Sequence, residues 1–252
     1  MIRVFAKEFN GFLNSLIAYI VIGVFLTGIG MLMWVFPETS ILDYGYADMD
    51  TLFSLGPYVF VFLIPAITMR SFAEEKKMGT MEFLLTKPLS EWGIIIGKFL
   101  ACFALVAVAV MPTLIYYCSV YLLGEPVGNV DTPGVIGSYI GLLLLGGAFC
   151  SIGVFASSIT PNQIVSFVVA AFLCLVFYSG FDSFSSLVAQ GAWALQIKQL
   201  GILEHYGSMG RGLIDSRDVL YFLSITGLML LFFYLFFFYK CLLLICSNSF
   251  RL

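Results

Sequence analysis

The sequence predicts an all-α, polytopic membrane protein with six transmembrane helices, and three observations support this. Hydrophobic residues make up 61% of the chain and charged residues only 11%, whereas soluble domains contain about 45–50% apolar residues. Long stretches of the chain carry no charge at all. Lysine and arginine are concentrated in alternate segments between these stretches.

Charge-free runs define the spans, because a helix needs about 20 apolar residues to cross the hydrocarbon. The run Thr132–Phe181 would measure about 75 Å as a single helix, so we expect it to turn back near Pro161. The predicted spans are Phe12–Phe36, Leu52–Met69, Phe99–Leu123, Val135–Ile159, Ile164–Phe181 and Val219–Tyr239.

Basic residues set the expected orientation. With the N-terminus inside, the outer segments hold three basic residues, and the first outer loop, "PETSILDYGYADMD", has four acids and no base. The positive-inside rule therefore places both termini in the cytoplasm. The nine basic residues of the inner segments are Arg3, Lys7, Arg70, Lys76, Lys77, Lys87, Lys98, Lys240 and Arg251.

Two segments outside the spans are expected to lie along the membrane surface. Phe5, Phe9 and Phe12 recur at helical spacing in "RVFAKEFNGFL", which predicts an N-terminal interfacial helix. The last outer segment, 182–218, is apolar but interrupted by Lys198 and glycines. It predicts one or two short helices at the outer leaflet, with Trp193 at the interface.

Several chemistries are disfavoured by the sequence. It contains no GxxxxGK[ST], HExxH, GxSxG or paired-cysteine motif, and the single histidine, His205, has no suitable companions for a metal. We therefore expect no catalytic residue, cofactor, metal or nucleic-acid site. The predicted spans also lack Asp and Glu, which counts against an ion-coupled carrier.

The stretch Ser71–Leu100 contrasts with this apolar background, since it holds eight of the 27 acidic and basic residues. One interpretation is a solvated loop whose lysines follow the positive-inside rule. The other is a short docking helix, because Met78, Met81 and Leu85 fall on one helical side between the charges. The residues alone leave both interpretations open.

The run "FAEEKKMGTMEFLLTKPLSEWGIIIGKFLA" (Phe72–Ala101) resembles the signature of the type-2 ABC transporter permease family. That signature combines a Glu-Glu-Lys/Arg run, Gly-Thr-x-Glu, Thr-x-Pro and a distal Gly-Lys, which here is Gly97–Lys98. The run "HYGSMGRGLIDSRDVLYFLS" (His205–Ser224) is similar to the segment before that family's last span. Within the family, the combination is most similar to gliding-motility permeases.

The resemblance implies that residues 1–252 form a single six-span permease domain in the cell inner membrane, without ATPase activity of its own. The loop between spans two and three would act as a coupling helix to a separate ATPase subunit. The implied partners are that ATPase, a second permease chain in a homo- or heterodimer, the lipid bilayer and an auxiliary membrane or periplasmic motility protein. The implied coupling residues are Glu74, Glu75, Lys76, Gly79, Thr80 and Glu82.

We expect this permease to couple ATP hydrolysis to export or to envelope and gliding-motility work. A non-transporting membrane scaffold, driven by the same ATPase within a motility apparatus, is the alternative. A secondary carrier is a third possibility. Binding of a co-expressed ATPase distinguishes the first two from the third.

Overall fold

The computed structural model describes residues 1–80, 90–187, 192–210 and 215–249, with backbone only at 44, 192 and 237–249. These residues form helices and no strand. The helices are α1 (Ile2–Leu13), α2 (Leu16–Trp34), α3 (Ile41–Tyr44), α4 (Asp50–Thr68), α5 (Arg70–Lys77), α7 (Glu91–Val110), α8 (Leu114–Leu123), α9 (Thr132–Ile159), α10 (Gln163–Leu175), α11 (Phe181–Leu187), α12 (Ala192–Gln199), α13 (Ile202–Met209) and α14 (Ser216–Ser249).

Among the described residues, six stretches of helix are long and apolar enough to cross a membrane, which agrees with the six predicted spans. Two of them contain a local irregularity. A 3-10 turn at Met111–Thr113 joins α7 to α8, where Pro112 has no backbone N–H to donate. A π-helical turn at Val176–Gly180 joins α10 to α11.

Side chains at the first residues of the spans define where several helices begin. The Ser15 hydroxyl accepts from the Ile17 N–H at the start of α2, and Ser90 accepts from Gly93 at the start of α7. Asp131 and Asn162 cap α9 and α10 in the same way. These contacts satisfy backbone N–H groups that have no partner inside the helix.

Helix α9 lies at the centre of the bundle. It packs against α4, α7, α10, α13 and α14, and 78% of its most apolar stretch is buried, against 17% for α14. Small residues permit this close packing. A Cβ added at Gly146 would lie 3.0 Å from Val106 of α7, and one at Gly153 would overlap Thr68 of α4.

The glycine pairs Gly93–Gly97 and Gly137–Gly141 have GxxxG spacing. The second glycine of each pair marks a close approach, but to a short helix rather than to a neighbouring span. A Cβ at Gly97 would lie 3.0 Å from Val4 of α1. A Cβ at Gly141 would lie 3.2 Å from the Cβ of Met209 in α13. Gly97 and Gly141 therefore allow α1 and α13 to pack closely against the bundle.

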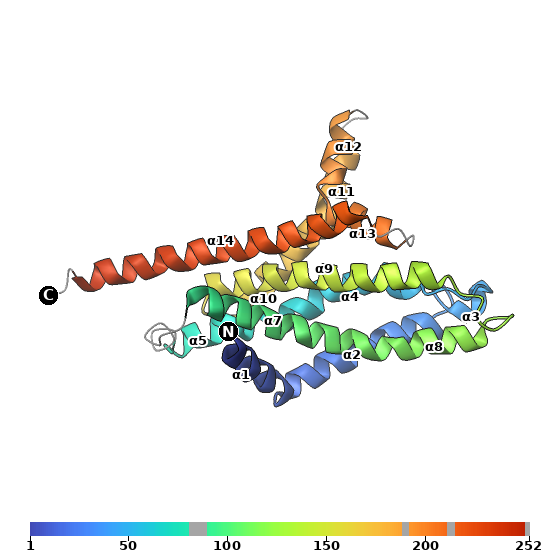
Figure 1. Ribbon diagram of the computed structural model, residues 1–252, viewed down its shortest axis with the longest axis horizontal. Coiled ribbons are helices and arrows are strands. Elements are labelled where there is room, and N and C mark those ends of the chain that lie inside the picture. The colour runs from blue at the N-terminus through green and yellow to red at the C-terminus, as the bar shows by residue number, and fades with distance from the viewer. Residues whose placement is uncertain (81–89, 188–191, 211–214, 250–252) are drawn as a thin grey trace.

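The bundle has two distinct ends (Figure 1). One end, called here the α5 end, carries α1, α5 and the C-terminal part of α14. The opposite end, called here the α3 end, carries α3 and the end of α8. Helix α1 has an apolar face and a charged face, as predicted for an interfacial helix. Helices α11 and α12 project away from the bundle axis (Figure 1).

Three sequence-based boundaries need correction. Helix α7 begins at Glu91 rather than Phe99, because Lys98 lies inside the helix and is neutralised there. Helix α14 runs from Ser216 to Ser249, well beyond Val219–Tyr239, and includes Asp218. The fifth span ends at Leu187 rather than Phe181, because α11 continues it, and the described part of the outer segment then holds two short helices, α12 and α13, within the predicted one or two.

Candidate functional site

Lys98 is the centre of a charged cluster at the α5 end. Its side chain is only 2% exposed, and its Nζ lies 3.0 Å from Glu75 Oε1 and 3.3 Å from Glu8 Oε1. The same nitrogen donates to the Ser71 carbonyl at 2.5 Å. It also lies 4.8 Å from the centre of the Phe72 ring. One ammonium group, carried by α7, therefore contacts both α1 and α5.

The arrangement is an electrostatic tie between these helices. An unpaired ammonium in an apolar interior costs several kcal/mol, so the two carboxylates, the carbonyl and the ring face compensate it together. Glu8 and Glu75 are 19% and 15% exposed, so both carboxylates are also largely withdrawn from water. Removal of Lys98 itself leaves two largely buried carboxylates without their shared cation.

The local sequence explains how Glu8 reaches Lys98. Gly97 precedes the lysine and has no side chain, so the first turn of α1 lies directly against α7. A Cβ at that position would meet both Val4 and the Met1 carbonyl. The Gly97–Lys98 pair therefore combines a close approach with the charge that fixes it.

Gly79 and Thr80 end helix α5. Gly79 has a φ of 69°, in the left-handed region that favours glycine. The Thr80 N–H donates to the Glu75 carbonyl at 3.0 Å, and the Gly79 N–H donates to the Lys76 carbonyl at 3.3 Å. This is the Schellman pattern of a helix C-terminus. The Gly-Thr pair of the signature therefore has a structural reason.

The structure separates the expected coupling residues into two groups. Glu75 faces inward to Lys98, and Glu74 lines a cavity beside it. Lys76 lies 5.8 Å from the ring of Phe236 in α14, while Gly79 and Thr80 are exposed at the end of α5. Glu82 lies outside the described residues.

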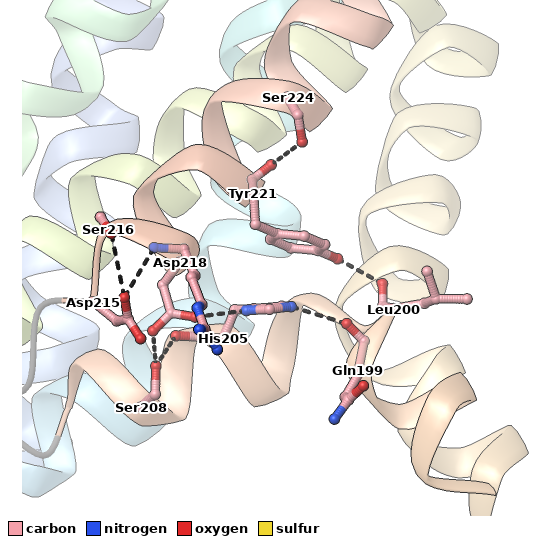
Figure 2. Close-up of polar contacts among 10 residues, drawn as sticks. Gln199, Leu200, His205, Ser208, Asp215, Ser216, Asp218, Tyr221 and Ser224 are labelled. Carbon is pink, nitrogen blue, oxygen red and sulfur yellow. Dashed lines mark hydrogen bonds and ion pairs between the residues drawn. The ribbon is translucent and has the colours of Figure 1, made fainter. Parts of the chain in front are cut away.

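A second polar cluster joins α13 to α14 at the α3 end (Figure 2). His205 Nδ1 lies 2.7 Å from Asp218 Oδ1, and His205 Nε2 lies 2.9 Å from the Gln199 carbonyl. The Ser208 hydroxyl donates to the other oxygen of Asp218. Tyr221 stacks on the His205 ring with centroids 3.8 Å apart and donates to the Leu200 carbonyl.

Ser208, His205 and Asp218 do not form a nucleophile–base pair. The hydroxyl of Ser208 is directed at the carboxylate, and the second nitrogen of His205 faces a backbone carbonyl. No imidazole nitrogen is thus left to activate the serine. Over the described ranges, no group of three or more His, Cys, Asp or Glu side chains could hold a metal ion. We interpret the cluster as a clamp.

Tyr206 extends this clamp into the bundle. Its hydroxyl donates to the Phe53 carbonyl of α4 at 2.8 Å. Burial raises the pKa of Tyr206 well above its ordinary value, so it remains a neutral donor. Helix α13 is therefore fixed to α4 on one side and to α14 on the other.

The sequence reasoning missed Lys98 and Asp218 as interior charges. The sequence could have indicated a buried position for Lys98, because "WGIIIGKFLACF" is apolar on both sides of the lysine. The sequence predicts spans without acidic residues, but Asp218 lies in the first turn of α14 and is buried. Its partner His205 is 13 residues away, and that spacing alone predicts no contact.

Comparison with known families adds an identification to this geometry. The family model described as "ABC-2 family transporter protein" matches residues 39–239, which is more than half of the chain. The chain belongs to this family and is a membrane permease subunit of an ABC transporter. Members of the family are permease components rather than enzymes, and they typically pair with an ATPase subunit. No curated protein matches the chain.

Replacement of Lys98 by methionine should destabilise the protein strongly. Lys98→Met keeps the length of the side chain but leaves Glu8 and Glu75 without their cation, which costs about 3–5 kcal/mol for a buried pair. The thermal unfolding midpoint of the purified protein in detergent measures the loss. Lys7→Met is the control, because Lys7 is exposed and its contact with Glu8 is long, at 3.8 Å, and therefore weak. Equal midpoints for the two variants would contradict the tie.

Asp218→Asn should loosen α13 while leaving the bundle folded. The Asn side chain has one accepting oxygen instead of two, so it cannot accept from both His205 and Ser208. The stability of this contact should fall by about 1–3 kcal/mol. Hydrogen exchange of the backbone of His205–Met209 should accelerate. Asp182→Asn is the control, because Asp182 is partly exposed and its contact with Lys198 is 3.8 Å long. Unchanged exchange in Asp218→Asn would remove the clamp assignment.

Proposed function

We propose that this permease subunit works with a separate ATPase chain that binds at the α5 end. The observation that carries the proposal is the position of α5. This helix continues the second span out of the bundle, is tied on its inner face by Lys98, and ends in an exposed turn at Gly79 and Thr80. Of the two sequence-based interpretations, we propose the docking surface, formed here by the exposed end of α5, because Met81 and Leu85 of the expected helix lie outside the described residues.

The tie supplies a physical route for coupling. A helix held by one central ammonium moves together with α1 and α7, because displacement of α5 alone would separate the Lys98–Glu75 pair. Closure of a bound ATPase at the end of α5 would therefore shift these three helices together. Coupling of this kind requires a packed element with two arrangements, and the α5 end is the proposed element.

The remaining parts of the proposal concern orientation and assembly. Both termini and the α5 end would face the cytoplasm of a cell with the protein in its inner membrane, which the nine-to-three distribution of basic residues supports. Two permease chains, identical or different, would assemble above two ATPase chains. Helices α2, α10 and α14 expose many large apolar side chains to lipid or to that second chain.

The work done by the complex is proposed to be export. Its use in gliding motility or envelope work, together with an auxiliary membrane or periplasmic protein, rests on the resemblance of the two sequence motifs. The scaffold alternative shares the same ATPase and the same α5 end. Substrate-dependent transport in vesicles that contain permease and ATPase separates the two functions.

Gly79→Ala should weaken ATPase binding more than it affects the permease. A Cβ at Gly79 meets no atom within 4 Å, but its φ of 69° costs a non-glycine residue about 1–2 kcal/mol. The turn then shifts away from the docking geometry, and the affinity falls by a factor of about 5–30. The measurement is binding of a co-expressed ABC ATPase subunit to the purified permease.

Gly45→Ala provides a closely matched control for this experiment. Gly45 also has a φ of 69° and open space around it, but it follows α3 at the opposite end of the bundle. The same backbone strain there should leave ATPase binding unchanged. Equal binding of wild type and both variants would reject the docking proposal, and equal loss in both would point to a general folding defect.

A further inference from the structure

A cavity of about 340 Å³ opens at the α5 end between α1, α2, α4, α5 and α7. Its volume falls within the range of about 300–1,000 Å³ that is typical of small-molecule sites. It lies where α2 begins and α4 ends, so in a bilayer it would lie towards one end of these spans. Part of its wall is apolar, formed by Phe12, Ile17, Ala66, Ile67 and Leu105.

Two charged side chains that line this cavity carry buried atoms without a partner among the described residues. They are Nε of Arg70 and Oε2 of Glu75. Arg70 makes one long hydrogen bond, from NH1 to the Ser15 hydroxyl at 3.5 Å, and forms no ion pair within the described part of the chain. Glu75 uses only its other oxygen, Oε1, for Lys98. A donor and an acceptor of opposite charge are thus both unsatisfied.

The overall charge of the lining indicates what kind of ligand compensates these atoms. Three basic residues, Lys7, Arg70 and Lys98, are balanced by three acidic ones, Glu8, Glu74 and Glu75. A neutral lining does not favour a ligand with net negative charge. It suits a ligand that carries both a negative and a positive group, next to an apolar portion.

We propose that the cavity binds the phosphoethanolamine headgroup of a zwitterionic membrane phospholipid. The phosphate takes the free face of the Arg70 guanidinium, whose planar donors match phosphate oxygens. The ammonium donates a hydrogen bond to Oε2 of Glu75. The glycerol and first acyl carbons lie along the apolar wall.

The chemistry of Glu75 selects a primary ammonium over choline. A quaternary ammonium has no N–H to donate to a buried carboxylate oxygen, and its usual recognition uses several aromatic faces. Phe12 is the single aromatic residue among the lining residues. The site is independent of ATPase docking, because it is argued from the interior of the α5 end and not from its exposed turn.

The test measures lipids bound to the purified full-length protein by native mass spectrometry in detergent. Equimolar phosphatidylethanolamine, phosphatidylglycerol and phosphatidylcholine with the same acyl chains are added, and soluble phosphoethanolamine is added in a separate arm. Wild type should retain phosphatidylethanolamine about tenfold over the other two lipids, because phosphatidylcholine has no N–H to donate to Glu75 and phosphatidylglycerol has no positive group to pair with it. Equal retention of the three lipids would overturn the proposal. Binding of soluble phosphoethanolamine as tight as that of the lipid would overturn the lipid source.

Variants locate the site. Arg70→Gln should lower the retention of all three lipids about tenfold, because it removes the cation that binds their shared phosphate. Lys77→Gln, a loss of charge on the same helix outside the cavity, should leave retention unchanged. Gly11→Leu fills space without removing a charge, because Gly11 lines the cavity and an added Cβ meets no atom within 4 Å. It should also reduce retention, and Gly23→Leu, with similar space on α2, should not. Unchanged retention of phosphatidylethanolamine in both Arg70→Gln and Gly11→Leu would contradict the assignment.

Discussion

The ammonium group of Lys98 is the interaction on which the α5 end depends. It is a charge inside a spanning helix, and it is stable there because α1 and α5 each bring a carboxylate to it. The two carboxylates depend on Lys98 in turn, because neither Glu8 nor Glu75 is well hydrated. Three helices from distant parts of the chain therefore occupy fixed positions relative to one another, and the end of α5 is presented outward.

The α3 end is organised by a comparable device with different chemistry. There the carboxylate of Asp218 is the central group, and His205 and Ser208 of α13 satisfy it. Between the two ends the bundle is almost wholly apolar and is packed around α9, whose glycines and serines allow close contact. Polar interactions thus fix the short helices at each end, while dispersion and shape fix the spans. This division suits the proposed coupling, in which the ends move while the spans stay packed.

The number and approximate position of the spans could be predicted because the membrane makes a simple demand on length and charge. The search for charge-free runs failed at Lys98, because the residues that neutralise it, Glu75 and Glu8, lie 23 and 90 positions away in the sequence. It also failed at Asp218, whose contact with His205 depends on how α13 folds back on α14. The Gly79–Thr80 turn was visible as a motif, but its physical reason, helix termination, required the backbone.

The central claim is that the α5 end, held by Lys98, faces the compartment where ATP is bound. Single thiols placed at Lys77 and Asp43, in a variant that lacks all six native cysteines, test it most directly. Both positions are exposed, and they lie at opposite ends of the bundle. With a membrane-impermeant maleimide on intact cells, the account predicts that Asp43→Cys is labelled and that Lys77→Cys is labelled only after the cells are opened. Labelling of Lys77→Cys in intact cells would contradict it.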